Sequence, residues 1–163
     1  MAITLDGTNG ITFNNSTVQA SAGSVLQVVN ATYSTQASNS TTTYADTGLT
    51  ATITPKFNTS KILVLINHPE NYKTGGNVAN DLALNLCRNG TQLVQFNTGL
   101  GYTNSTVVLA FSASYTYLDS PATTSATTYK TQFKNGDANA AAVYVQFNAA
   151  NAPSSITLME IAV

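Results

Sequence analysis

The sequence contains very little charge. Only 8% of its 163 residues are Asp, Glu, Lys or Arg, against about 25% in an average soluble domain. Nucleic-acid backbones are bound by clustered Lys and Arg side chains. Six basic residues spread along a chain of net charge −1 do not form such a cluster. The composition therefore argues against a nucleic-acid partner.

Long apolar runs are also missing. A helix that spans a bilayer needs about 20 consecutive apolar residues, whereas the apolar runs here, such as residues 62–66, have the length of a short strand. The first six residues, Met-Ala-Ile-Thr-Leu-Asp, contain neither the positive charge nor the apolar stretch of a signal peptide. We therefore expect no membrane insertion and no signal-directed export.

Cysteine and histidine occur once each, as Cys87 and His68. A single cysteine excludes an intrachain disulfide, and Cys87 lies in an apolar segment where we expect a small buried side chain. His68, Glu70 and Asp81 could be considered as metal ligands, but no second His or Cys stands at ligand spacing. We therefore expect no metal site and no cofactor.

The seven carboxylates are dispersed along the chain. A glycosidase would need two of them brought together by folding, within about 5–10 Å. Most stand beside turn residues, where Asp commonly bonds its own backbone. We therefore expect no catalytic residues. A polysaccharide depolymerase that uses Glu70 and Asp81 is the enzymatic alternative.

Residues that favour β-structure are abundant. Thr, Val, Ile, Tyr and Phe suit pleated, half-buried surfaces, and helix-forming residues are scarce. Alternating or apolar segments separated by turn residues indicate about eight or nine strands, and Asn89-Gly90 is a strong hairpin signal. The sequence therefore predicts an all-β fold, an antiparallel β-sandwich of the jelly-roll type, over residues 25–163. The predicted strands are 25–33, 49–54, 61–67, 82–88, 91–96, 107–117, 127–133, 142–147 and 155–161.

Residues 1–24 differ from the rest and are predicted to form a short N-terminal β arm with a linker. Segments 3–5, 11–13 and 17–19 read as very short strands, and such strands cannot build a core of their own. We expect the arm to add its strands to a neighbouring protein. The apolar side chains expected to anchor it are Ile3, Leu5, Ile11, Phe13 and Val18.

Most of the eight tyrosines stand in strand patterns. Tyr72 and Tyr102 instead stand in the two long predicted loops, 69–80 and 97–106. An aromatic ring at a loop tip can stack on a sugar, so these two residues are the candidates for contact with a receptor.

The neutral surface itself points to association. Lysine side chains commonly prevent exposed edge strands from pairing with other proteins. Lysine is scarce in this chain, so its strand edges have little of this protection. Symmetric self-assembly would bury part of such a surface and would depend little on salt.

Several stretches resemble proteins of bacteriophage particles. Residues 3–13, ITLDGTNGITF, resemble the start of many phage tail-fibre and appendage proteins. Residues 46–55 with 59–64 resemble the entry to a domain common in phage virion proteins, and 84–91, 118–130 and 156–163 resemble its later part. The resemblance implies a virion location and a trimeric jelly-roll head, and it supplies no catalytic residues. The chain lacks the shaft repeats of a long fibre.

These observations together predict a non-enzymatic structural protein on the virion surface, made in the host cytoplasm. The first hypothesis is a capsid decoration or cement protein that forms a homotrimer and binds the major capsid protein or a tail or vertex protein. The second is a short tail fibre or adhesin head that binds a host-surface glycan.

Overall fold

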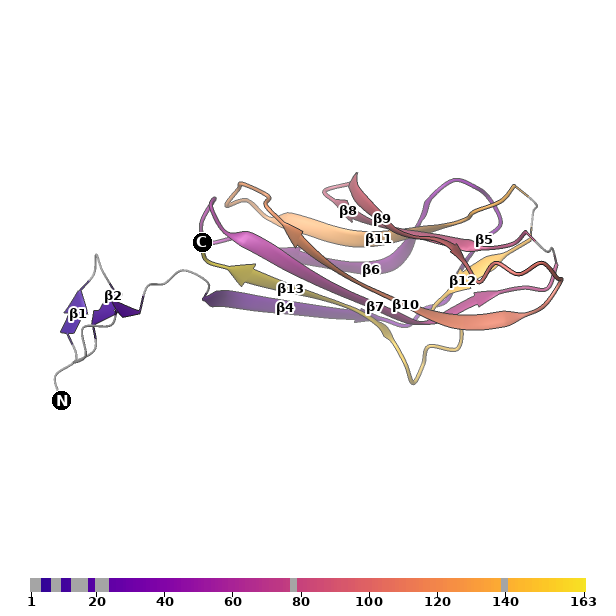
Figure 1. The fold of residues 1–163 in the computed structure, drawn as a ribbon, viewed down its shortest axis with the longest axis horizontal. Helices are drawn as coiled ribbons and strands as arrows, with labels where there is room; N and C mark the ends of the chain where they lie inside the picture. The colour runs from indigo at the N-terminus through magenta and orange to yellow at the C-terminus, as the bar shows by residue number, and fades with distance from the viewer. Residues whose placement is uncertain (1–3, 7–9, 13–17, 20–23, 77–78, 139–140) are drawn as a thin grey trace.

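The computed structural model describes residues 4–6, 10–12, 18–19, 24–76, 79–138 and 141–163. All regular secondary structure in these residues is β-strand. Two antiparallel sheets, here called sheet I and sheet II, pack face to face, and a third small sheet is formed by the N-terminal strands (Figure 1). The predicted β-sandwich is confirmed.

Sheet I is built around the long strand β7. On one side β7 pairs with β10, and on the other side it pairs with β13 and then β12. Strand β4 pairs with β13, and β5 pairs with β12. The edges of sheet I are therefore β10 on one side and β4 with β5 on the other. Its strands are β4 (Val25–Tyr33), β5 (Ala37–Asn39), β7 (Lys61–Lys73), β10 (Leu109–Asp119), β12 (Val143–Val145) and β13 (Ser154–Ile161).

Sheet II has four strands in the order β6-β11-β8-β9. They are β6 (Ala45–Ile53), β8 (Leu82–Arg88), β9 (Thr91–Leu100) and β11 (Thr127–Asn135). The jelly-roll type remains a prediction. It is favoured by the pairing of β4 with β13, which joins the beginning of the sandwich to its end, and by the repeated crossing of the chain between the two sheets from β5 to β8 and from β9 to β12.

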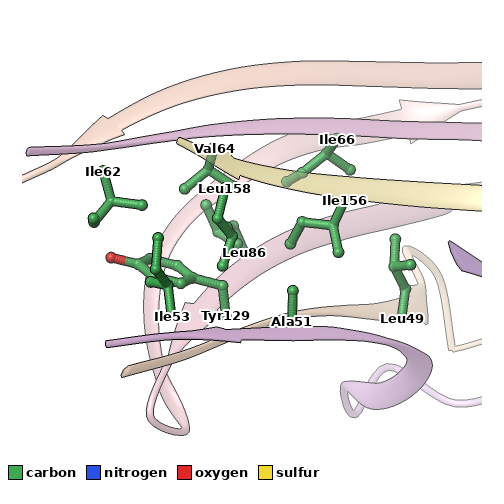
Figure 2. Packing of buried hydrophobic residues seen from close by; sticks show 10 residues of the cluster. All are labelled: Leu49, Ala51, Ile53, Ile62, Val64, Ile66, Leu86, Tyr129, Ile156 and Leu158. Carbon is green, nitrogen blue, oxygen red and sulfur yellow. The ribbon is translucent and has the colours of Figure 1, made fainter. Parts of the chain in front are cut away.

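The core lies between the sheets and forms two apolar clusters. Alternate residues of β7, β13 and β6 point into the larger one, as a period of two requires when one face of a strand is buried. Figure 2 shows its ten buried side chains: Leu49, Ala51, Ile53, Ile62, Val64, Ile66, Leu86, Tyr129, Ile156 and Leu158. The smaller cluster contains Leu82, Leu84, Ala113, Phe133, Val143 and Val145.

The predicted hairpin at Asn89-Gly90 is confirmed. Both residues have positive φ, 48° and 84°, as a two-residue turn between twisted strands requires. Arg88 stands opposite Thr91, which fixes the register of β8 against β9.

Strand β7 continues beyond its predicted end at residue 67. Pro69 would normally interrupt a central strand, because it has no N–H to donate. Here it falls at an irregularity in the pairing with β10, where His68 stands opposite Ala113 and Asn71 opposite Phe111. The bulge removes the need for that hydrogen bond. As a consequence, the prediction that Tyr72 lies in a loop is wrong, because Tyr72 belongs to β7.

The N-terminal strands are β1 (Thr4–Asp6), β2 (Gly10–Thr12) and β3 (Val18–Gln19). They pair antiparallel in chain order as a separate three-stranded sheet. Leu5 stands opposite Ile11, and Thr12 stands opposite Val18. The short strands expected of the arm are therefore present, whereas the division of the chain at residue 24 stays a prediction.

Candidate assembly surfaces

The three residues considered as metal ligands stand in different surroundings. His68 is fully buried between the sheets, whereas Glu70 lies at the bulge of β7 and Asp81 immediately precedes β8. Within the part of the chain that the structure describes, no three His, Cys, Asp or Glu side chains lie close enough to hold a metal ion.

The carboxylate whose charge acts on Asp81 belongs to Asp137 rather than to Glu70. Burial raises the pKa of Asp81, and Asp137 raises it further, against the opposing effect of the Gly136 amide. The depolymerase alternative that uses Glu70 and Asp81 stays a prediction. Sequence alone does not indicate that Asp137 approaches Asp81, because this approach depends on the pairing of β11 with β8.

His68 is the centre of a buried polar layer that separates the two apolar clusters. Its Nδ1 lies 2.9 Å from Ser154 Oγ and 3.4 Å from the amide nitrogen of Gln146, and its Nε2 lies 3.0 Å from Thr131 Oγ1. An amide nitrogen can only donate, so these partners assign the ring proton to Nε2. Burial lowers the pKa of His68 to about 4.

The pair Ser154–His68 has the spacing of a nucleophile and its base. Both residues, however, are 0% exposed, and the other ring nitrogen meets the hydroxyl of Thr131 instead of a carboxylate. The pair therefore fits a structural role, in which it joins β7, β11 and β13. Sequence reasoning missed it, because Ser154 stands in a serine-rich chain far from His68.

Cys87 is buried, as predicted. It lies on the outer face of sheet II, since its neighbours Leu84 and Leu86 point into the core. Its Sγ lies 3.3 Å from the side-chain oxygen of Gln132. Burial raises the pKa of the thiol, so Cys87 is a covered, protonated side chain.

A polar ladder covers Cys87 and crosses sheet II from β6 to β9. The Asp46 carboxylate accepts hydrogen bonds of 2.7 Å from both Lys130 and Gln132. On the far side, the amide of Asn85 donates to Gln92 over 3.0 Å. The charged and amide side chains of the polar ladder thus supply one another's hydrogen-bond partners on the outer face of sheet II.

The hollow beside the polar ladder, between β6 and β11, has a volume of ≈ 240 Å³. Ligand pockets usually measure about 300–1,000 Å³. The hollow is therefore too small to indicate a small-molecule site.

Tyr72 packs into an aromatic cluster on sheet I. Its ring stacks on Phe147, with centroids 4.0 Å apart and planes 8° apart, and Tyr144 meets both rings edge-on. Tyr102 is 55% exposed in the loop between β9 and β10. Only Tyr102 therefore stands free in a loop, as predicted, and no ring contact joins it to Tyr72 among the described residues.

The edge strands β9 and β10 lie on the same side of the sandwich. Phe96 of β9 stacks on Tyr115 of β10, with a centroid distance of 5.2 Å. Between Arg88 and Asp119 the sequence contains no charged residue and no proline. We call residues 91–100 of β9 and 109–118 of β10, which ends at Asp119, the uncharged edge. These residues lack the charged side chains and prolines that usually prevent an exposed strand from pairing with another protein.

Of the predicted anchor residues, Leu5, Ile11 and Val18 lie on β1, β2 and β3. Ile3 and Phe13 lie outside the described residues. In the described part of the chain, no helix is long and apolar enough to cross a membrane.

The chain was also compared with known proteins. It matches no protein-family model, and no curated protein is similar to it.

Proposed function

We propose that this chain is a non-enzymatic structural protein of a bacteriophage particle, a capsid decoration or cement protein that assembles as a homotrimer on the virion surface. The observation that carries the proposal is the uncharged edge. Two edge strands on the same side of the sandwich have unpaired backbone groups and, before Asp119 at the end of β10, no charged side chain, which favours association with another chain. The virion location and the trimeric state in this proposal come from the resemblance of residues 3–13, 46–55 and 118–130 to virion proteins.

The arm, residues 1–24, supplies the attachment in this proposal. Strands of two or three residues are too short to hold together through a core of their own. They suit addition to the sheet of a neighbour, such as the major capsid protein, where backbone hydrogen bonds give affinity. Ile3, Leu5, Ile11, Phe13 and Val18 are the side chains proposed to fix the arm in place.

The polar groups of the sandwich support a structural role. His68 and Cys87 are buried, and Asp46 is neutralised by Lys130 in an ion pair of 2.7 Å. A depolymerase that uses Glu70 and Asp81 remains the enzymatic alternative, and the charge of Asp137 also acts on Asp81. Cleavage of host polysaccharide by the wild type, abolished in Asp81→Asn, would favour it.

The second candidate is a short tail fibre or adhesin head that binds a host-surface glycan. The exposed ring of Tyr102 favours this role, because a sugar can stack on it. The cluster of Tyr72, Tyr144 and Phe147 offers a second aromatic surface.

Copy number separates the two structural roles. We expect gel densitometry of purified particles to show about as much of this protein as of the major capsid protein. A handful of copies per particle would instead place the protein at the tail or a vertex and favour glycan binding. Complete absence from particles would overturn both roles.

A further inference from the structure

Four apolar side chains form a row across the outer face of sheet I. Met159 of β13 stands opposite both Val28 of β4 and Leu63 of β7, and Leu63 stands opposite Leu118 of β10. Residues directly opposite one another in antiparallel strands point to the same face. The four residues therefore make one continuous line, here called the apolar row, from one edge of the sheet to the other.

The apolar row points away from the core. Its chain neighbours Val29, Ile62, Val64, Leu158 and Tyr117 pack in or against the larger apolar cluster, and successive side chains of a strand alternate between faces. Val28 and Leu118, at the two ends of the row, are 54% and 51% exposed. Leu63 and Met159, in the middle, are half-buried.

The surroundings of the apolar row contain little charge: in the three neighbouring rows, Lys61, which stands opposite Ile161 on one side of the apolar row, is the one charged residue. The next row along the strands is Asn30, Thr157, Leu65 and Thr116, and the one after it is Thr32, Ser155, Asn67 and Ser114. Neither contains a charge. The outer face of sheet II instead displays the Asp46–Lys130 ion pair within the polar ladder. The outer face of sheet II is thus suited to contact with water, and the outer face of sheet I is suited to burial against another protein surface.

We infer that the apolar row is the contact between copies of this chain, each presenting the row to its neighbours. The inference deepens the proposed function and rests on the self-assembly in it. A face whose paired rows carry a single lysine, Lys61, and no carboxylate offers little to orient a charged partner, since complementary charges supply much of the specificity between different proteins. It matches a second face that is equally poor in charge, and every further copy provides one. Symmetric assembly then buries the same apolar line on each copy.

The test places a charge in the middle of the row. Leu63→Glu puts a carboxylate at the centre of the contact, so the assembly is expected to dissociate to single chains of 17.0 kDa. The mass in solution is measured by light scattering or sedimentation, with circular dichroism to confirm folding. The matched control is Thr52→Glu, which adds the same charge at an exposed position of β6 in sheet II. It is expected to keep the wild-type mass.

A second variant keeps the test decisive if Leu63→Glu fails to fold. Leu118→Cys places a thiol at the exposed end of the row, and Thr52→Cys serves as its control. Mild oxidation is expected to link Leu118→Cys chains in pairs and to leave Thr52→Cys chains unlinked, while the covered Cys87 is common to both proteins. If Leu118→Cys chains become linked no more often than Thr52→Cys chains, the inference is overturned.

The outcomes also separate the inference from the function. A monomeric wild type, or a folded Leu63→Glu protein of unchanged mass, overturns the apolar row as the contact even if the protein is abundant on particles. An assembly that dissociates in Leu63→Glu supports the row. If the wild-type protein is in addition absent from particles, the virion role fails and the contact stands.

Discussion

His68 lies inside the sandwich with both ring nitrogens hydrogen-bonded to hydroxyl groups. The layer that it forms with Thr131 and Ser154 falls between the two apolar clusters. On β11 this is visible as Tyr129 in one cluster, Thr131 in the polar layer and Phe133 in the other cluster. A buried histidine in such a layer makes the stability of the fold depend on pH.

Mild acid is expected to destabilise the protein through His68. The folded ring has a pKa of about 4, against about 6.5 when unfolded. Between these values the unfolded chain binds a proton that the folded chain does not, so the free energy of unfolding decreases as the pH falls from 6.5 towards 4. Urea unfolding is expected to show a loss of about 2 kcal/mol between about pH 7.5 and pH 5.

The control for this prediction is His68→Gln, which retains hydrogen-bonding groups but cannot titrate. The variant is expected to be less stable than the wild type at pH 7 and to lose little more at pH 5. Asp81, whose raised pKa acts in the opposite direction, contributes equally to both proteins. Equal losses in wild type and variant would show that His68 is not the group responsible.

Among the elements, β6 contains a glycine that its packing requires. Gly48 has a φ of 89°, and a Cβ at this position would overlap the ring of Tyr33 from β4. Gly90, in the hairpin, has a similar φ of 84° but open space around the same position. Replacement of the two glycines by alanine therefore distinguishes two losses of folding stability. One comes from the strained backbone conformation, and the other comes from overlap of the new Cβ with Tyr33.

Alanine is expected to cost more at Gly48 than at Gly90. Gly90→Ala meets only the unfavourable φ, at a cost of about 1 kcal/mol in the free energy of unfolding. Gly48→Ala must also displace Tyr33 from the core, and overpacking brings the expected cost to about 3 kcal/mol. Thermal or urea unfolding of the two variants measures the difference. Equal costs would mean that Tyr33 moves aside freely.

Most strands of the sandwich were predictable from the sequence, because their residues alternate between faces or have clear turns between them. Strand β5 was missed: Ala37–Asn39 has no apolar pattern, and it is held by pairing with β12. The end of β7 was missed because Pro69 reads as a stop, although a bulge accommodates it. The apolar row could not be predicted from the sequence of any single strand, because it takes one residue from each of four strands and depends on how these strands are aligned in the sheet.

For the molecule as a whole, the described core lies in the sandwich. Among the residues whose side chains the structure describes, the two apolar clusters are built from the strands of both sheets. The N-terminal strands pair with one another in a separate sheet. We therefore predict that the stability of the sandwich and its proposed attachment to a particle can be changed independently.

Removal of residues 1–20 is expected to leave a folded, soluble protein that no longer binds particles. Its melting temperature should stay close to that of the full chain, because the described core lies in the sandwich strands. Binding is measured by cosedimentation with particles that lack the protein. Full-length chains with Leu5→Asp or Ile11→Asp are expected to bind weakly as well. Undiminished binding by the truncated protein would rule out the arm as the attachment device.

The uncharged edge also has a consequence for digestion. Trypsin cuts after Lys and Arg, and the sequence has neither between Arg88 and Lys130. Both edge strands and the exposed loop that contains Tyr102 thus lie within one stretch that has no cleavage site for trypsin. Because this stretch lacks Lys and Arg, we expect trypsin to leave it uncut even before assembly covers it.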